Sequence, residues 1–369
     1  MDSSAIEDSN LDFPGIPAFP TDVSTVPLLR INLHKLIHND ADELERVWEA
    51  CRTIGFFYLD LRTVESSKRD SGREQSMVEG VIDGDGLLND ASKLFQLGSQ
   101  FFDLPVEEKM KYDFREQGSY FGYKGFGAGV IDREGTRDRN EFYNTSKDFV
   151  LGLREGLPEP LMLTSDQNRS LMRDFMLRSH AVVTMLLNVI NDQLGLPEGT
   201  LRSLHRLREI SGDQVRWVKS PPQPQNDRKR ALGEHTDFGS VTLLFNRLGG
   251  LQVRPPGQEE WLYVRPLDGH CVVNLGDALV KFSAGILRSN LHRVVNPPGA
   301  QQHETRMSLV YFARPEDEVM LHALKDSEMI KAKAPAVEEE VNARDWILRR
   351  ALGRRVGGDF DASDGTEHK

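Results

Sequence analysis

This chain of 369 residues has little cysteine, no long apolar run and no excess of positive charge. Its two cysteines, Cys51 and Cys271, lie in apolar stretches, which excludes a disulfide scaffold and indicates buried thiols in a reducing compartment. No apolar run reaches the length of a membrane span, and no secretory leader is evident. The net charge of −11, from 46 basic and 57 acidic residues, argues against a nucleic-acid partner. We therefore expect a cytoplasmic protein with neither a membrane nor a nucleic-acid partner.

Composition divides the chain into five parts. Residues 1–26 are rich in proline, serine and aspartate and are predicted to form an arm. Residues 27–195 show mostly helical periodicity, whereas residues 210–325 contain short β-rich runs. A C-terminal helix is predicted at 336–355, and the tail at 356–369 is predicted to be disordered.

Two segments interrupt the helical pattern of the N-terminal region. Residues 63–86 are polar and glycine-bearing, and we interpret them as an exposed insertion to which no role can be assigned. Residues 117–129 alternate glycines with aromatic rings, which fits a substrate lid and a plain surface loop equally well.

The β-rich runs between residues 214 and 313 follow one another at regular spacing. Gly-Gly, Pro-Pro-Gly and Asp-Gly turns separate many of them. This texture predicts an antiparallel sandwich or jelly roll. The expected fold is mainly β with helices, in which the helix-rich N-terminal region packs against the β-core as one continuous unit.

Two histidines and a carboxylate in the β-region form a candidate metal site. His235 and Asp237 are two residues apart, so extended backbone would point both side chains to one side. His292, in another β-rich run, supplies a third ligand. This ligand set leaves one face of a metal open, as in non-haem Fe(II) oxygenases, although catalytic zinc sites also use it. The same spacing at His38 and Asp40 has no third ligand, and we interpret it as a helix start.

Arg306 and Ser308 follow the third ligand and share one face of a predicted strand. A guanidinium fork beside a hydroxyl is suited to holding a carboxylate. An Fe(II) enzyme that uses a 2-oxo acid and O₂ needs such a group, whereas a zinc hydrolase does not. The pair therefore favours iron with a 2-oxo acid.

With these motifs the chain resembles the 2-oxoglutarate/Fe(II)-dependent dioxygenases, in the branch that includes isopenicillin N synthase and many plant and fungal biosynthetic oxygenases. The resemblance covers nearly the whole chain, in the family's order, through residues 54–58, 101–109, 235–239, 250–253, 273–277, 291–294 and 306–308. It implies a double-stranded β-helix core and iron held by His235, Asp237 and His292. It also implies that Arg306 and Ser308 bind the distal carboxylate of 2-oxoglutarate.

The resemblance implies an enzyme that hydroxylates, desaturates or rearranges a small organic substrate. Residues 290–295 and 311–315 are most similar to fungal members, which are often found in specialised-metabolite pathways. Two alternatives stay open. One is an isopenicillin N synthase-like Fe(II) oxidase without 2-oxoglutarate, and the other is a non-catalytic binding protein of the same fold.

Tyr143, Trp217 and Phe312 are the candidate substrate contacts, and Phe312 matches a position that often borders the substrate in the family. Many members place a tyrosine where this chain has Ser220, which leaves one contact to 2-oxoglutarate undecided. Asp277 is interpreted as a turn residue. The cluster Arg349, Arg350, Arg354 and Arg355 suits a helix end without further function. The sequence decides neither the substrate and reaction outcome nor the choice between monomer and homodimer.

Overall fold

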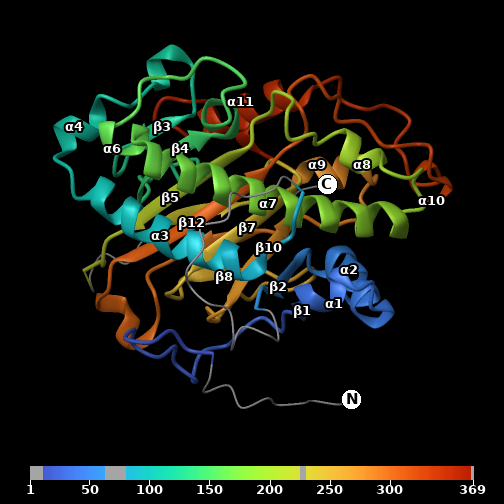
Figure 1. The fold of residues 1–369 in the computed structure, drawn as a ribbon, viewed down its shortest axis with the longest axis horizontal. Coiled ribbons are helices and arrows are strands. Elements are labelled where there is room, and N and C mark those ends of the chain that lie inside the picture. The colour runs from blue at the N-terminus through green and yellow to red at the C-terminus, as the bar shows by residue number, and fades with distance from the viewer. Residues whose placement is uncertain (1–10, 63–79, 225–229, 367–369) are drawn as a thin grey trace.

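The structure is a computed structural model that describes residues 11–62, 80–224 and 230–366 (Figure 1). Two β-sheets form its centre. The large sheet has the order β1-β2-β10-β7-β12-β5-β4-β3, and the small sheet has the order β6-β11-β8-β9. The large-sheet strands are β1 (Arg30–Asn32), β2 (Phe56–Asp60), β3 (Gly122–Lys124), β4 (Glu141–Ser146), β5 (Gln214–Ser220), β7 (Val241–Asn246), β10 (His270–Leu275) and β12 (Arg306–Ala313). The small-sheet strands are β6 (Leu232–His235), β8 (Leu251–Val253), β9 (Leu262–Tyr263) and β11 (His292–Val294).

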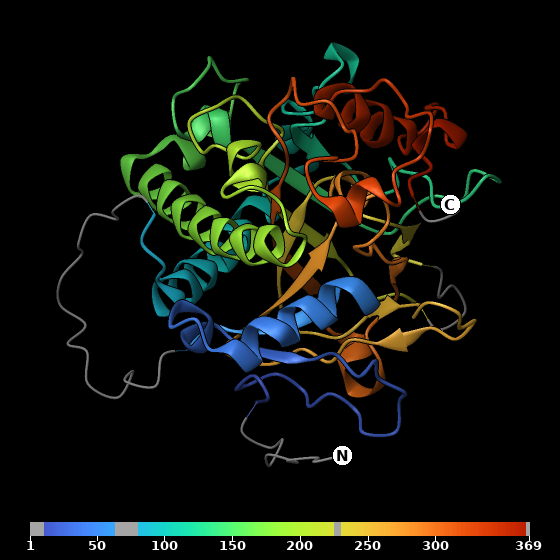
Figure 2. The same cartoon turned by 90° about the vertical axis from the view of Figure 1, so that its right-hand side faces the viewer.

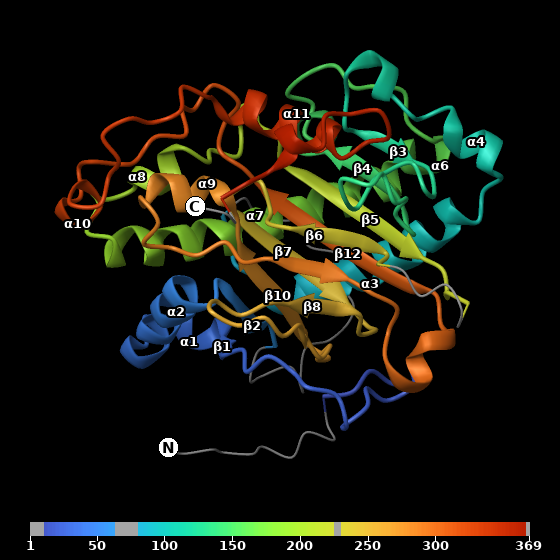
Figure 3. The same cartoon turned by 180° about the vertical axis from the view of Figure 1, so that it is seen from behind.

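Helices cover one face of the large sheet, and the small sheet lies on the other. Figure 1 shows α3 and α7 in front of the large sheet, and Figure 3 shows β6 and β8 on the opposite side. The α-helices are α1 (Leu33–Ile37), α2 (Ala41–Thr53), α3 (Gly84–Phe102), α4 (Val106–Met110), α5 (Lys147–Val150), α6 (Leu161–Thr164), α7 (Asp166–Gln193), α8 (Thr200–Ser203), α9 (Asp277–Phe282), α10 (Glu328–Lys331) and α11 (Ala343–Gly353). Short 3₁₀ turns are η2 (Arg115–Gln117), η3 (Gly299–His303) and η4 (Asp361–Ser363).

The predicted jelly roll is confirmed. Within the described residues β1 and β2 pair in parallel, and the other strand pairs are antiparallel. The β-rich runs between residues 214 and 313 are strands, with small shifts at their ends. Three strands, β3, β4 and β6, were not predicted. Strands β1 to β4 of the helix-rich N-terminal region belong to the same large sheet as β5 and β12, so the two regions form one continuous unit.

Alternation along the strands of the large sheet separates pocket residues from core residues. On β5, Arg216, Val218 and Ser220 line the pocket between the sheets. Trp217 points the other way, and its indole N–H donates to the Leu94 carbonyl of α3 at 2.8 Å. Gly98 makes this contact possible, because a Cβ there would lie 2.4 Å from Cδ1 of Trp217.

Helix α2 starts where the second His-x-Asp copy lies. Asp40 is its N-cap, and the Asp40 side chain accepts from the Glu43 amide at 3.0 Å. A short polar side chain in this position satisfies an amide that the helix leaves free. The interpretation of His38 and Asp40 as a helix start is therefore confirmed.

Residues 11–26 and 356–366, the described parts of the two terminal segments, are more ordered than predicted. In the N-terminal segment Leu11, Phe19 and Val26 are buried, and Figure 2 shows this segment running along the molecule below α2. At the C-terminus α11 is shorter than the predicted helix, and the tail up to residue 366 is packed rather than disordered. Ser363 is fully buried, and its carbonyl accepts from Nε of Arg350 at 3.1 Å. Composition alone did not predict these ends, because their partners are distant in sequence.

The predicted insertion at 63–86 lies mostly outside the described residues. Its last part is structured, since α3 begins at Gly84 and Asp83 accepts from the Gly86 amide at 2.9 Å as the N-cap. In the part of the chain that the structure describes, none of the helices combines the length and the apolar character needed to cross a membrane.

Candidate active site

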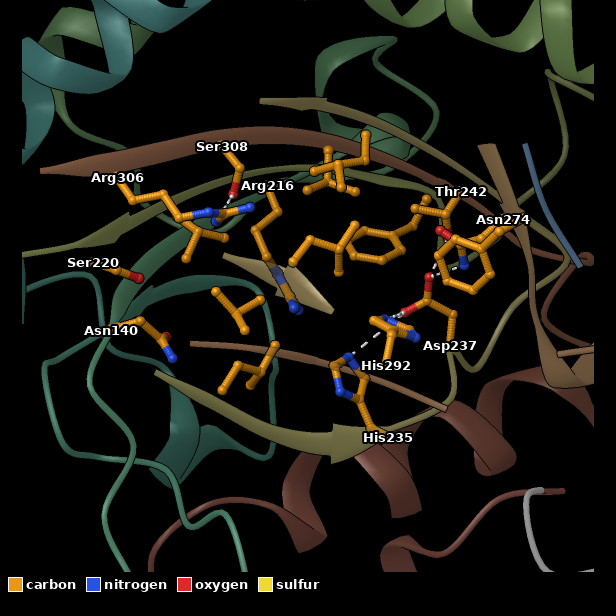
Figure 4. Close-up of a pocket in the computed structure, with 18 residues that line it drawn as sticks. Asn140, Arg216, Ser220, His235, Asp237, Thr242, Asn274, His292, Arg306 and Ser308 are labelled. Carbon is orange, nitrogen blue, oxygen red and sulfur yellow. Dashed lines mark hydrogen bonds and ion pairs between the residues drawn. The ribbon is translucent and has the colours of Figure 1, made fainter. Parts of the chain in front are cut away.

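A pocket of about 640 Å³ lies between the two sheets (Figure 4). An apolar lining with a few converging polar groups is typical of small-molecule sites. The polar lining residues are Asn140, Arg216, Ser220, His235, Asp237, Thr242, Asn274, His292, Arg306 and Ser308. The apolar lining residues are Phe56, Val218, Leu232, Leu244, Leu251, Val294, Val310 and Phe312. The pocket thus combines an apolar wall with two groups of polar side chains.

His235, Asp237 and His292 lie together on one side of this pocket. His235 ends β6 and is the direct cross-strand partner of His292, which begins β11. Oδ1 of Asp237 lies 4.0 Å from Nε2 of His235 and 3.8 Å from Nε2 of His292. One ligand atom from each residue falls within 4.8 Å of the other two. Asp237 reaches this position from the loop after β6, not from one strand shared with His235 as predicted.

Hydrogen bonds fix the orientation of all three side chains. Nδ1 of His235 contacts the Gly233 carbonyl at 2.8 Å, and Nδ1 of His292 contacts the Asn290 carbonyl at 3.1 Å. Because a carbonyl only accepts, each Nδ1 carries the hydrogen and each Nε2 keeps a free lone pair. The two Nε2 atoms are therefore available as metal ligands.

The carboxylate of Asp237 is held in the same way. Its Oδ2 accepts from Oγ1 of Thr242 and from Nδ2 of Asn274, each at 2.6 Å, so Oδ1 is left toward the histidines. Thr242 and Asn274 are cross-strand neighbours on β7 and β10. Supporting contacts of this kind orient metal ligands in proteins. Sequence reasoning missed both residues, because their role depends on strand pairing.

The electrostatics also suit a divalent cation. Burial, and then the neighbouring His292, lower the pKa of His235 well below its usual value, which keeps the imidazole neutral. Burial acts to raise the pKa of Asp237, but His292, His235, Asn274 and Thr242 outweigh it and the pKa is lowered. Neutral imidazoles and an ionised carboxylate are the forms that bind metals. The residues present therefore fit Fe(II) with one face left open.

Arg306 and Ser308 lie across the pocket from these three residues (Figure 4). Nε of Arg306 donates to the Gly249 carbonyl at 2.9 Å, and Nη1 donates to Oγ of Ser308 at 3.3 Å. Ser220 faces Arg306 across the β5–β12 pair. Burial lowers the pKa of Arg306 to about 10. None of the described carboxylates pairs with Arg306, so its charge remains available to a ligand.

Phe312 lines the pocket as predicted, but Tyr143 and Trp217 do not. Trp217 faces α3, and the ring of Tyr143 lies 4.7 Å from that of Phe101 in the same core. Trp217 on β5 and its cross-strand partner Tyr143 on β4 thus face the helices, so the structure does not bring these two predicted substrate contacts to the pocket. Ser220 and Arg216 lie on the same face of β5. Once Ser220 is placed at the pocket, the alternation of the strand therefore predicts Arg216, and not Trp217, as a pocket residue.

A buried ion pair supports the loop that carries Asp237. Arg350 of α11 pairs with Oδ2 of Asp277, and neither side chain is exposed to solvent. Thr236 donates to the same carboxylate at 2.9 Å, and Thr366 donates to its other oxygen at 2.6 Å. The Asp277 amide donates to the Asp237 carbonyl at 2.9 Å. Asp277 is thus a buried anchor rather than a plain turn residue, and Arg350 has a function beyond the helix end.

The comparison with known sequences agrees with this geometry. A profile of the 2OG-Fe(II) oxygenase superfamily matches residues 190–315, and one of the N-terminal region of non-haem dioxygenases in morphine synthesis matches residues 82–159. A 2-oxoglutarate-dependent dioxygenase of Aspergillus fumigatus is 31% identical over 348 residues, covering 87% of this chain and 84% of that relative. This chain belongs to the 2-oxoglutarate/Fe(II)-dependent dioxygenases.

Further relatives are similar to this dioxygenase over most of its length. The 2-oxoglutarate-dependent dioxygenase frbH of Dothideomycetidae sp. is 30% identical over 344 residues, covering 93% of this chain and 94% of frbH. The crystal structure of a full-length Neurospora crassa protein in complex with alpha-KG has a TM-score of 0.69 and 23% identity, covering 90% of this chain and 97% of that protein. This structural likeness shows the shared fold.

The predicted enzyme class and cofactors are confirmed by family membership. The dioxygenase is an oxidoreductase that depends on Fe(II) and 2-oxoglutarate and uses O₂. The comparisons give no support to an oxidase without 2-oxoglutarate or to a non-catalytic binding protein.

Proposed function

We propose that His235, Asp237 and His292 bind the Fe(II) of this dioxygenase, and that Arg306 and Ser308 bind the distal carboxylate of 2-oxoglutarate. The observation that carries the proposal is the convergence of three neutral or anionic ligand atoms within 4.8 Å at the wall of the pocket. Arg306, which is buried and has no carboxylate partner in the part of the chain that the structure describes, lies across that pocket. A dianionic co-substrate fits between these two groups.

The proposed substrate is a small organic molecule of fungal specialised metabolism. The similarity to fungal dioxygenases supports this assignment. A plant relative, codeine O-demethylase of Papaver somniferum, is 28% identical over 355 residues, and its name identifies codeine as the molecule it demethylates. Hydroxylation is the default outcome, and desaturation or rearrangement requires only a different position of the substrate.

When bound, iron together with 2-oxoglutarate and O₂ supplies the oxidising power to break a C–H bond, and 2-oxoglutarate leaves as succinate and CO₂. The residues of the chain position the reactants. Arg306 orients the co-substrate through a fork of donors that burial keeps dry. Apolar side chains such as Phe56, Leu244 and Phe312 exclude water from the substrate side. Since Asp237 fills the third ligand position, a halide has no vacant position there, and halogenation is disfavoured.

The test is an anaerobic titration of the metal-free protein with Fe(II) and then with 2-oxoglutarate. We expect iron binding followed by the weak visible charge-transfer band of the chelate. The His235→Ala variant should lose iron binding with its fold retained by circular dichroism. The Arg306→Ala variant should bind iron but lose the band.

Two results would contradict the proposal. If the unmodified protein binds iron but shows no charge-transfer band, the result would favour an Fe(II) oxidase that does not use 2-oxoglutarate. In such an oxidase Arg306 would bind a carboxylate of the substrate. No iron binding would remove the assignment of the three ligands.

The cytoplasmic location stays a prediction supported by two free, buried cysteines, and the domain boundaries stay predictions as well.

A further inference from the structure

Arg216 is a second arginine in the pocket, and the proposed function gives it no role. It projects from β5 into the pocket (Figure 4). Its Nε donates to Oδ1 of Asn144 at 2.7 Å, and no other hydrogen bond of its guanidinium is found among the described residues. The guanidinium lies over the rings of Phe142 and Phe312, at 4.3 and 5.0 Å from their centroids. These contacts fix the group while leaving its terminal nitrogens toward the pocket.

The surroundings of Arg216 do not neutralise its charge. Within the described ranges none of the carboxylates forms an ion pair with it. Two further arginines lie nearby, because Arg314 also lies over the Phe312 ring and Arg355 over the Phe142 ring. Burial, and then Arg314, lower the pKa of Arg216 to about 9, against the influence of Asp237. The group is still cationic at neutral pH.

The charges of the loaded site leave Arg216 without a counter-charge. Fe(II) is a dication and 2-oxoglutarate a dianion. In the sum of the charges at the site, the negative charge of Asp237 and the positive charge of Arg306 also cancel. Arg216 then contributes one positive charge to a largely desolvated pocket, where an uncompensated cation is unfavourable. An anionic ligand would remove this cost.

We propose that Arg216 binds a carboxylate of the substrate, so that the dioxygenase acts on small organic acids with an apolar body. This inference rests on the proposed function, which assigns Arg306 to 2-oxoglutarate. Arginine is suited to the task because its planar fork matches a carboxylate. Val218, Leu244 and Val310 line the same pocket and would contact the apolar part of such an acid.

The experiment measures binding of paired probes rather than turnover. The protein is loaded with Zn(II) in place of iron and with saturating 2-oxoglutarate, so that Arg306 is occupied. Ligand-observed NMR then gives the affinities of 3-phenylpropionate and 4-phenylbutyrate and of their neutral primary amides. We expect each acid to bind roughly tenfold more tightly than its amide, as for a charge-assisted hydrogen bond.

The variants identify the residue responsible. Arg216→Gln should abolish the preference for the acid, and Arg216→Lys should retain part of it. Lys219→Gln is the matched control, because it removes a cation of the same strand that does not line the pocket. It should leave the preference unchanged.

Several results would overturn the inference. Equal binding of acid and amide, or no binding of the acids, would exclude a carboxylate site in the loaded pocket. An acid preference that survives in Arg216→Gln would place the site elsewhere. If Arg216→Gln instead weakens 2-oxoglutarate, titrated separately, the residue belongs to the co-substrate. Failure of the unmodified protein to bind metal or 2-oxoglutarate would count against the proposed function itself.

Discussion

Arg350 and Arg306 are both buried, and they differ in what surrounds their positive charge. Arg350 pairs with Asp277 and contacts Thr236, whereas the hydrogen bonds of Arg306 to described residues go to a carbonyl and a hydroxyl oxygen. Removing an ion from water is unfavourable by several kcal/mol unless a counter-charge is present. We infer that Arg350, which the protein itself neutralises, serves the fold, whereas Arg306, which lines the pocket, is placed to bind an anion. Arg216 belongs with Arg306 in this respect.

Removing the counter-charge of Arg350 should have the largest effect. Asp277→Ala leaves a buried, unpaired guanidinium, and we expect the free energy of unfolding to fall by about 3–5 kcal/mol. Chemical denaturation measures this change. Glu328→Ala is the control, because its exposed ion pair with Lys331 should contribute less than about 1 kcal/mol. If Asp277→Ala lowers the free energy of unfolding no more than Glu328→Ala does, the buried pair does not stabilise the fold.

Arg306→Met should act on ligand binding rather than on the fold. We expect the Kd for 2-oxoglutarate to rise roughly 30-fold or more, as for loss of one partner of a buried charge pair. Anaerobic titration of the Fe(II) protein gives this value. Arg350→Met is the reciprocal control, which should lower stability and leave the Kd much less affected. If both variants behave alike, the distinction between the two arginines is not valid.

A smaller effect is expected from the residues that hold the carboxylate of Asp237. Thr242→Val removes one hydrogen bond to Oδ2 while keeping the shape of the side chain, and we expect iron affinity to fall about 10- to 100-fold. Competition with a chelator of known affinity measures it. Thr145→Val is the control, since its hydroxyl donates to Glu159 away from the pocket. Unchanged iron affinity in Thr242→Val would contradict a supporting role.

The smallest effect concerns a buried carboxylate that its arginine neutralises only in part. Burial raises the pKa of Asp90, between α3 and α7, to about 6 despite the pairing with Arg178. A raised carboxyl pKa contributes stability that is present below about pH 3.9 and is lost as the pH rises through about 6. Asp90→Asn should therefore gain stability relative to the unmodified protein between pH 4 and 7, measured by thermal unfolding. A constant difference over this range would contradict the shift.

Local patterns predicted much of this dioxygenase. The spacing of His235 and Asp237, the later His292 and the alternation around Arg306 are visible in the sequence, and the jelly roll follows from regularly spaced strands and turns. Short strands such as β6 were missed because four residues give little periodicity, and pairing with β11 holds them in place. Long-range partners were also missed, because local patterns do not show which distant residues meet. Arg350 and Asp277, for example, are 73 positions apart.

The face of β5 shows how a correct strand can still give a wrong site. The sequence indicated a β-rich run here and offered Trp217 as a candidate substrate contact, but the Trp217 side chain faces α3. The period of two assigns Arg216 to the pocket once Ser220 is placed there. Register, rather than residue type, decided this point.

The contact of Arg350 with Asp277 also has a consequence for how the enzyme is made. A ribosome adds all three proposed iron ligands before it reaches α11, so a nascent chain can carry the complete ligand set while Asp277 still lacks its guanidinium partner. A frameshift or premature stop codon between residues 340 and 350 would likewise spare every ligand and remove Arg350. A gene truncated in this way would retain the family's motifs, but its product would leave a buried carboxylate unpaired directly beside the loop that carries Asp237.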